Sequence, residues 1–286
     1  MKVAIMTDVE GVAGVINSTD WIHPDSKYYE EAKVLLTEEV NAAIRGLYEA
    51  GATETVVIDA HGPGAINTVL LDKRALYSRG WDITYQFGLN DGFDAIIWIG
   101  QHARAGTPLS HLTHTGSMYV LEERINGLSV GEYAINAFVA GMYGVPAVFA
   151  SGERALKEEI MEITPWVHFV EVKHGVRRDN GANCDAESYA THNWGAIHVH
   201  PEVARERIYE GVKTAMQDFV KNPEKFKPVC PEPPYVFEIW TRKRKEYPAQ
   251  KIIKRHDKDL LKALTGKYEE YEEGTYELPY EYEKLD

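Results

Sequence analysis

Residues 1–15, MKVAIMTDVEGVAGV, begin as an apolar run and end in carboxylates and glycines. A short apolar run without alternation is typical of a strand that is covered on both faces of a parallel sheet. Asp8 and Glu10 follow at once, and strand side chains two residues apart share a face. In open parallel sheets, functional residues gather beyond the carboxyl ends of the strands. The opening therefore predicts a parallel sheet and the edge at which its site would lie.

The same plan recurs along the chain. Apolar residues at helical spacing predict a helix within residues 25–52, with Gly51 near its C-terminus. Further strands are expected within residues 53–64, 93–106, 145–152 and 166–175, and further helices within residues 128–144 and 153–164. Apolar strands that alternate with helices indicate an α/β fold with a mainly parallel sheet and helices on both of its faces.

The composition changes near Pro228. The stretch 230–248, CPEPPYVFEIWTRKRKEYP, contains four prolines and then alternates like an exposed strand, and the end of the chain is rich in tyrosine and glutamate. We predict an α/β domain over residues 1–226, which would carry any site at the strand ends, and a small strand-rich appendage over residues 227–286. Its last residues suit an exposed or subunit-facing strand pair, and thus contacts within an oligomer.

The composition argues against several classes of partner and site. The 286 residues carry a formal net charge of −13, which disfavours nucleic acid and anionic membranes as partners. No stretch approaches the ~20 apolar residues of a membrane span, and the first residues lack the pattern of a signal peptide. Cys184 and Cys230 form no CxxC pair, which argues against a cysteine zinc site. We therefore expect a cytoplasmic protein that binds neither nucleic acid nor membrane.

Three more candidate ligands follow the pattern of Asp8 and Glu10. His61 comes two residues after the last residue of the predicted strand VVID, His102 comes directly after AIIWIGQ, and Glu132 opens the helix that begins after Gly131. Because the ends of parallel strands meet at one edge of a sheet, these side chains would converge there. Oxygen and imidazole ligands without thiolate suit Zn²⁺, Mn²⁺ or Co²⁺.

The number of candidate ligands points to two ions. Five protein ligands are too many for one tetrahedral ion that must keep an open position, but they suit two ions ~3.5–4 Å apart that share a bridging carboxylate. Three carboxylates against two divalent ions leave about one positive charge, which a hydroxide would neutralise. Hydroxide is also the nucleophile that hydrolysis needs. The pattern thus predicts a dinuclear hydrolytic centre.

Two further histidines follow in the stretch 109–118, LSHLTHTGSM. A histidine beside a two-metal centre could transfer protons or stabilise a tetrahedral intermediate. His111 and His114 are both candidates, and both could equally be ordinary loop residues, since their spacing alone does not separate the roles.

Several motifs in order resemble the zinc-dependent D-aminopeptidase family, the M55 peptidases. They are DVEGVAG (8–14), TEEVNAAIRG (37–46), VVIDAHG (56–62), GQHARAGTP (100–108), THTGSM (113–118) and VGEYAINAFVAGMYGVPAVFASGE (130–153). The resemblance runs from residue 1 to about 175 and continues more weakly to about 240. It implies two zinc ions per subunit and closed homo-oligomeric rings, decamers built from pentamers. Residues 173–201 are longer than the corresponding segment usual in the family. If they border the site, the substrate preference of this chain would differ from that of the family.

The resemblance also implies a role for each candidate ligand. Asp8 would bridge the ions, Glu10 and His61 would complete one site, and His102 and Glu132 would complete the other. The family's catalytic histidine lies in a SHSM-like motif. That motif corresponds here to THTGSM and points to His114, with His111 as the alternative because the spacing after His102 differs.

We therefore expect a dinuclear-metal aminopeptidase that hydrolyses the N-terminal bond of short peptides, D-amino-acid peptides among them, by a metal-activated hydroxide. Two alternatives remain open at this stage. The same ligands would serve a dinuclear metallo-amidase or phosphoesterase. They would also serve a non-catalytic, ring-forming binding protein that its metal ions stabilise.

Overall fold

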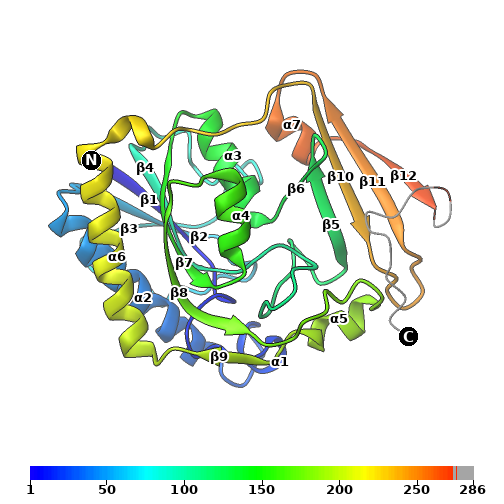
Figure 1. The fold of residues 1–286 in the computed structure, drawn as a ribbon, viewed down its shortest axis with the longest axis horizontal. Coiled ribbons are helices and arrows are strands. Elements are labelled where there is room, and N and C mark those ends of the chain that lie inside the picture. Colours follow the sequence, from blue (N-terminus) through cyan, green and yellow to red (C-terminus); the bar gives the residue numbers. More distant parts are fainter. Residues whose placement is uncertain (273–274, 276–286) are drawn as a thin grey trace.

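The computed structural model describes residues 1–272 and 275, and its core is a seven-stranded sheet in the order β3-β2-β1-β4-β7-β8-β9 (Figure 1). The strands are β1 Lys2–Thr7, β2 Glu54–Asp59, β3 Leu76–Ser78, β4 Ala95–Gln101, β7 Ala147–Glu153, β8 His168–Gly175 and β9 Ala196–His198. All neighbours pair in parallel except β8 and β9, which are antiparallel. The predicted fold class is confirmed.

Helices cover both faces of this sheet (Figure 1). On one face α2 (Tyr29–Glu49) packs against α6 (Pro201–Lys221), and on the other lie α3 (Glu132–Met142) and α4 (Leu156–Ile163). In β4, Ile97 and Ile99 point into the first core, whereas Ile96 and Trp98 point into the second. Alternate residues of one strand thus enter different cores, which explains why the strand is apolar throughout.

The shorter elements connect these layers. They are α1 Ser18–Trp21, α5 Ala186–His192 and the 3₁₀ turn η1 Pro223–Lys225. The predicted helix within residues 25–52 is α2, and Gly51 follows its C-cap residue Ala50 with a φ of +95°. Left-handed backbone is accessible to glycine at little steric cost, so Gly51 ends the helix as predicted.

A second sheet, entirely antiparallel, has the order β12-β11-β10-β5-β6. Its strands are β5 Val120–Ile125, β6 Leu128–Ser129, β10 Tyr235–Thr241, β11 Gln250–His256 and β12 Tyr268–Glu272, with α7 Leu260–Thr265 between the last two. The sheet therefore combines a hairpin from the middle of the chain with the C-terminal strands. The predicted domain boundary between residues 226 and 227 stays a prediction, and the end of the proposed tyrosine-rich strand pair, 273–274 and 276–286, lies outside the described residues.

Candidate metal centre

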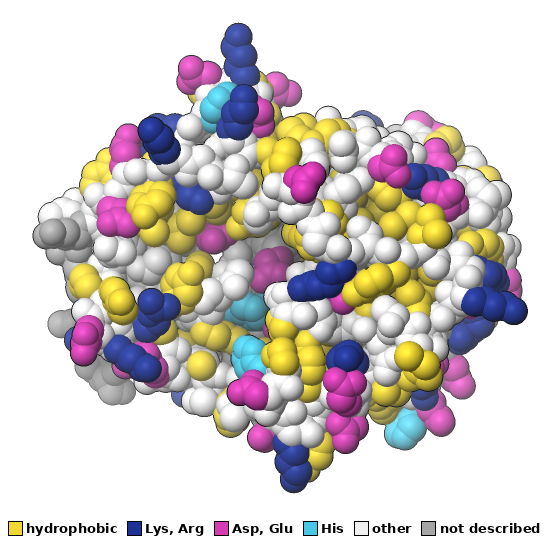
Figure 2. Space-filling view, turned by 180° about the vertical axis from the view of Figure 1, so that it is seen from behind, with side chains coloured by type: hydrophobic (Ala, Val, Ile, Leu, Met, Phe, Trp, Pro, Cys, Tyr) yellow, Lys and Arg dark blue, Asp and Glu magenta, His cyan; other side chains and the backbone are white. Residues whose placement is uncertain are grey.

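A cavity of about 980 Å³ opens where the carboxyl ends of the parallel strands meet the second sheet. It appears in Figure 2 as a hollow that contains histidine and acidic side chains. The sheet order explains its position. The chain proceeds from β1 to β2 and β3 on one side, whereas β4, β7 and β8 lie on the other side of β1. Such a reversal of strand order leaves a crevice, which is the usual ligand site in open α/β sheets.

Asp8 lies at the centre of this crevice, between two histidines. Its Oδ1 atom is 3.3 Å from His61 Nδ1, and its Oδ2 atom is 3.1 Å from His102 Nε2. Glu10 Oε2 lies 3.2 Å from the same nitrogen of His61, and Glu132 Oε1 lies 3.5 Å from that of His102. The five residues predicted as ligands are thus brought together, with Asp8 between the two halves.

The histidines are oriented by the backbone. Each uses one ring nitrogen to contact a carbonyl oxygen: His61 Nε2 with Ile22 at 3.0 Å, His102 Nδ1 with Ala103 at 2.8 Å and His114 Nδ1 with Leu112 at 2.8 Å. A ring nitrogen that faces a carbonyl oxygen must carry the proton, so in the neutral ring the other nitrogen offers a lone pair. Backbone contacts of this kind fix the tautomer of histidines that bind metal ions.

These lone pairs face carboxylate oxygens, which are also acceptors. Within the described residues, His102 Nε2 and Glu10 Oε2 are buried without a hydrogen-bond partner. Two acceptors at hydrogen-bonding distance repel each other unless a cation lies between them. Burial opposes the charge on His61 and His102, yet the neighbouring carboxylates raise the pKa of both rings well above the usual value. The donor set therefore calls for positive charge and fits divalent ions with oxygen and imidazole ligands.

Neighbouring residues hold the site in place. Gln101 Nε2 donates to Asp8 Oδ2 over 3.1 Å, and the amide of Gly116 donates to Glu132 Oε1 over 2.8 Å. Glu159 accepts from the amides of Gly131 and Ala134, which fixes the first turn of α3, where Glu132 lies. Neither Gln101 nor Glu159 is among the site residues predicted from the sequence. The position of Gln101 beside His102 was the one available signal.

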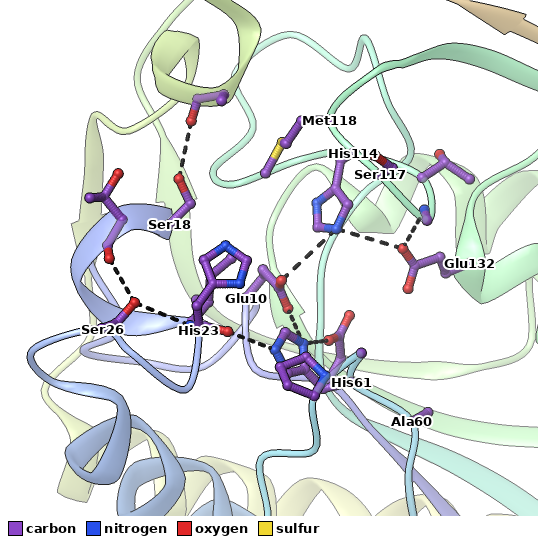
Figure 3. Close-up of a pocket in the computed structure, with 18 of the residues that line it drawn as sticks. Glu10, Ser18, His23, Ser26, Ala60, His61, His114, Ser117, Met118 and Glu132 are labelled. Carbon is purple, nitrogen blue, oxygen red and sulfur yellow. Dashed lines mark hydrogen bonds and ion pairs between the residues drawn. The ribbon is translucent and has the colours of Figure 1, made fainter. Parts of the chain in front are cut away.

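His114 lies at the site, whereas His111 does not. The His114 ring stacks on His102 with centroids 4.2 Å apart. Figure 3 shows His114 between Glu10 and Glu132; its Nε2 atom is 3.9 Å from Glu10 Oε1 and 3.8 Å from Glu132 Oε1. His111 is fully buried outside the cavity lining, and its Nε2 atom donates to the carbonyl of Ile16 over 2.9 Å. Of the two candidates, only His114 is placed where a substrate could reach it.

Two threonines bring His114 into this position. Thr113 Oγ1 donates to the carbonyl of Ala103 over 2.7 Å, and Thr115 Oγ1 accepts from the amide of Ala105 over 3.0 Å. The residues on either side of His114 are thereby bound to the loop that follows His102. The stretch THTGSM is thus shaped by pairing with the stretch HARAG.

Comparison with known proteins agrees with this geometry. The family model for peptidase M55, described as D-aminopeptidase, matches residues 1–271. The chain belongs to the M55 D-aminopeptidase family. A D-aminopeptidase of Bacillus subtilis (strain 168) is 32% identical over 183 residues, which span 62% of this chain and 65% of that M55 relative.

A solved structure extends the similarity. It is described as a Zn-dependent D-aminopeptidase, DppA, from Bacillus subtilis, a self-compartmentalizing protease. It superimposes with a TM-score of 0.76 and 25% identity over 92% of this chain and 94% of that chain. The predicted family is therefore confirmed. A separate observation concerns membranes: within the described part of this M55 chain, every helix is too short or too polar to span a bilayer.

Proposed function

We propose that this chain is a zinc-dependent aminopeptidase that removes the N-terminal residue of short peptides, including peptides of D-amino acids. The family membership and the names of the two relatives support this activity. The observation that carries the proposal is the position of Asp8, whose two oxygens face the lone-pair nitrogens of His61 and His102. A carboxylate in this position suits a bridge between two ions.

The ligand assignment follows from the contacts. Asp8, Glu10 and His61 lie together as one group of possible ligands and would hold one ion. His102 and Glu132 form a second group together with His114, and the contact between His102 and Asp8 makes Asp8, His102 and Glu132 the proposed ligands of the other ion. Zn²⁺ is preferred, with Mn²⁺ or Co²⁺ as substitutes. Bound divalent ions would polarise the scissile carbonyl and lower the pKa of a coordinated water molecule. Gln101 would keep the Asp8 carboxylate in its bridging orientation.

His114 is proposed as the residue that handles protons. Its Nδ1 atom is bound to the Leu112 carbonyl, so Nε2 is the atom that faces the cavity. When Nε2 carries a proton, His114 would stabilise the developing oxyanion and then pass that proton to the leaving amine. Its stacking on His102 keeps the ring beside the proposed metal ligands without requiring it to be one of them.

An assay of the zinc-loaded protein tests the function. We expect hydrolysis of D-alanyl and L-alanyl dipeptides and tripeptides, and no hydrolysis of the same peptides after N-acetylation. Chelator should abolish turnover, and added Zn²⁺, Mn²⁺ or Co²⁺ should restore it. Cleavage of a phosphodiester alone would favour a phosphoesterase. Full metal occupancy without hydrolysis of any of these substrates would favour the non-catalytic alternative.

We further propose that the subunits assemble into a closed ring, with contacts made in part by residues 227–286 as a C-terminal unit. The description of the solved relative as self-compartmentalizing supports an assembly of this kind. Native mass spectrometry would test it, with a homodecamer expected and a monomer at micromolar concentration contradicting it. A cytoplasmic location also remains a prediction, which cell fractionation would test.

A further inference from the structure

One carboxylate in the cavity does not belong to the proposed metal-binding set. Glu123, in β5, lines the cavity together with Glu132, although it comes from the second sheet. Glu123 is only 6% exposed, and its Oε2 atom has no hydrogen-bond partner within the described residues. A buried carboxylate without a partner is costly, so such a group in a ligand cavity calls for an explanation.

No cation forms an ion pair with the Glu123 carboxyl within the described residues. Burial and the charge of Glu132 raise the pKa of Glu123 to about 8, and Lys254 only partly offsets them. The Lys254 ammonium is itself 2.7 Å from the Leu264 carbonyl oxygen. The adjacent Glu122 also has an Oε2 atom without a hydrogen-bond partner within the described residues, but its Oε1 atom accepts from Arg124 Nε over 2.6 Å. Within the described residues Glu123 is therefore an acidic group without an ion-pair contact, beside a neighbour that has one.

The other carboxylates of the cavity have different positions. Six line it, and three of these are the proposed ligands Asp8, Glu10 and Glu132. Asp20 is partly exposed and accepts from Asn17 Nδ2 over 3.1 Å, and Asp25 is exposed to solvent. Glu123 alone among the six is buried, outside the proposed ligand set and unpaired within the described structure.

We propose that Glu123 binds the protonated α-amino group of the substrate. This inference rests on the proposed aminopeptidase function, which requires recognition of a free N-terminus. An ammonium group would supply the missing partner and up to three hydrogen-bond donors. Charge-assisted hydrogen bonds of this kind are short and strong in buried sites. Glu123 thereby determines specificity for free amines, while Asp8 and its neighbours hold the metal ions.

Paired probes test the proposal by binding as well as by turnover. D-alaninamide and propanamide differ only in the amino group, and their affinities for the zinc-loaded protein can be measured by calorimetry and by competition with a peptide substrate. The unmodified protein should bind D-alaninamide about 10- to 100-fold more tightly than propanamide, the range expected for one hydrogen bond to a charged group. In Glu123→Gln the ratio should fall close to one, and in Glu123→Asp it should recover in part.

Glu122→Gln is the matched control, because it removes the neighbouring carboxylate, whose partner is Arg124 rather than a ligand. This variant should keep the preference for D-alaninamide, and all variants should keep the zinc content of the parent. An unchanged preference in Glu123→Gln would overturn the inference and indicate that the metal ions hold the amine. A loss confined to lysyl peptides would also overturn it, because it would place a side-chain amine at Glu123.

These outcomes separate the inference from the proposed function. If the unmodified protein hydrolyses no peptide with a free N-terminus, the proposed function fails. If it hydrolyses them and Glu123→Gln does so with unchanged KM and unchanged amine preference, the function stands and the inference about Glu123 fails.

Discussion

The backbone of Gly100 lies against the backbone of Asp8 so closely that a Cβ atom on Gly100 would be 2.1 Å from the Asp8 carbonyl oxygen. Gly100 also has a φ of +78°. It precedes Gln101 and His102 at the end of β4, whereas Asp8 follows β1. The absence of a side chain at position 100 therefore sets how closely two strands deliver the proposed ligands Asp8 and His102 to each other.

Gly100→Ala should separate these strand ends. The clash and the strained backbone together should lower the free energy of unfolding by about 2–5 kcal/mol and reduce zinc affinity. Gly144→Ala is the control: Gly144 has a φ of +77°, but a Cβ atom there would meet nothing within 4 Å, so about 1–2 kcal/mol of backbone strain is expected. Denaturant unfolding and zinc titration would measure both. Equal effects of the two substitutions would contradict the role given to the close approach.

Asp8→Asn should remove the bridge between the two halves of the site. The change keeps the shape of the side chain but removes the negative charge shared by His61 and His102. We expect bound zinc to fall from two ions to one or none, as measured by elemental analysis of the protein after gel filtration. Asp25→Asn, at the exposed part of the cavity, should keep both ions. Two tightly bound ions in Asp8→Asn would refute the assignment.

His114→Ala should lower kcat by about 10²- to 10⁴-fold, the usual range for loss of a group that transfers protons. Its zinc content should be unchanged, because His114 is proposed as a proton carrier rather than a ligand. His111→Gln should retain kcat within a few-fold, since the glutamine amide can still donate to the Ile16 carbonyl. Loss of one zinc ion in His114→Ala would instead make His114 a ligand, which its distance of 3.8 Å from Glu132 allows.

His111 should also make stability depend on pH. Burial, with a smaller contribution from the charge of Lys173, lowers the pKa of His111 from 6.5 to about 2. Between these values the unfolded chain binds the proton and the folded chain does not, so stability is lost as the pH falls below about 6.5. The difference in unfolding free energy between His111→Gln and the unmodified protein should shift by about 1–3 kcal/mol in favour of the variant between pH 7 and pH 4.5.

Because both proteins share every other titratable group, the contributions of those groups cancel in the difference between the two unfolding free energies. Chemical denaturation of the metal-free proteins at several pH values would measure it. A difference that stays constant over this range would show that His111 keeps an ordinary pKa in the folded state.

The sequence alone predicted which residues at the strand ends come together, but it did not predict the rest of the cavity. Asp8, His61 and His102 each follow an apolar strand, and the geometry of parallel sheets fixes where such residues meet. The choice between His111 and His114 depended on side-chain contacts of Thr113 and Thr115, which have no periodic signal.

The position of Glu123 in the cavity could not be predicted from the sequence, for a different reason. Its place in the cavity depends on β5 pairing with β10, and Glu123 lies opposite Ile239 in that ladder. Local sequence does not encode a pairing across more than a hundred residues, and Glu122 and Glu123 look alike in the sequence. Which of the two faces the cavity is determined by the register of the sheet.

The pairing of β5 with β10 also has a consequence for biosynthesis. A ribosome makes Asp8, His61, His102 and Glu132 within the first half of the chain, but β10 begins only at Tyr235. The emerging polypeptide thus carries every proposed zinc ligand well before the strand that supports Glu123 has been translated. A chain interrupted before Tyr235 would therefore contain all of the proposed zinc ligands but lack the strand that pairs with β5 beside Glu123.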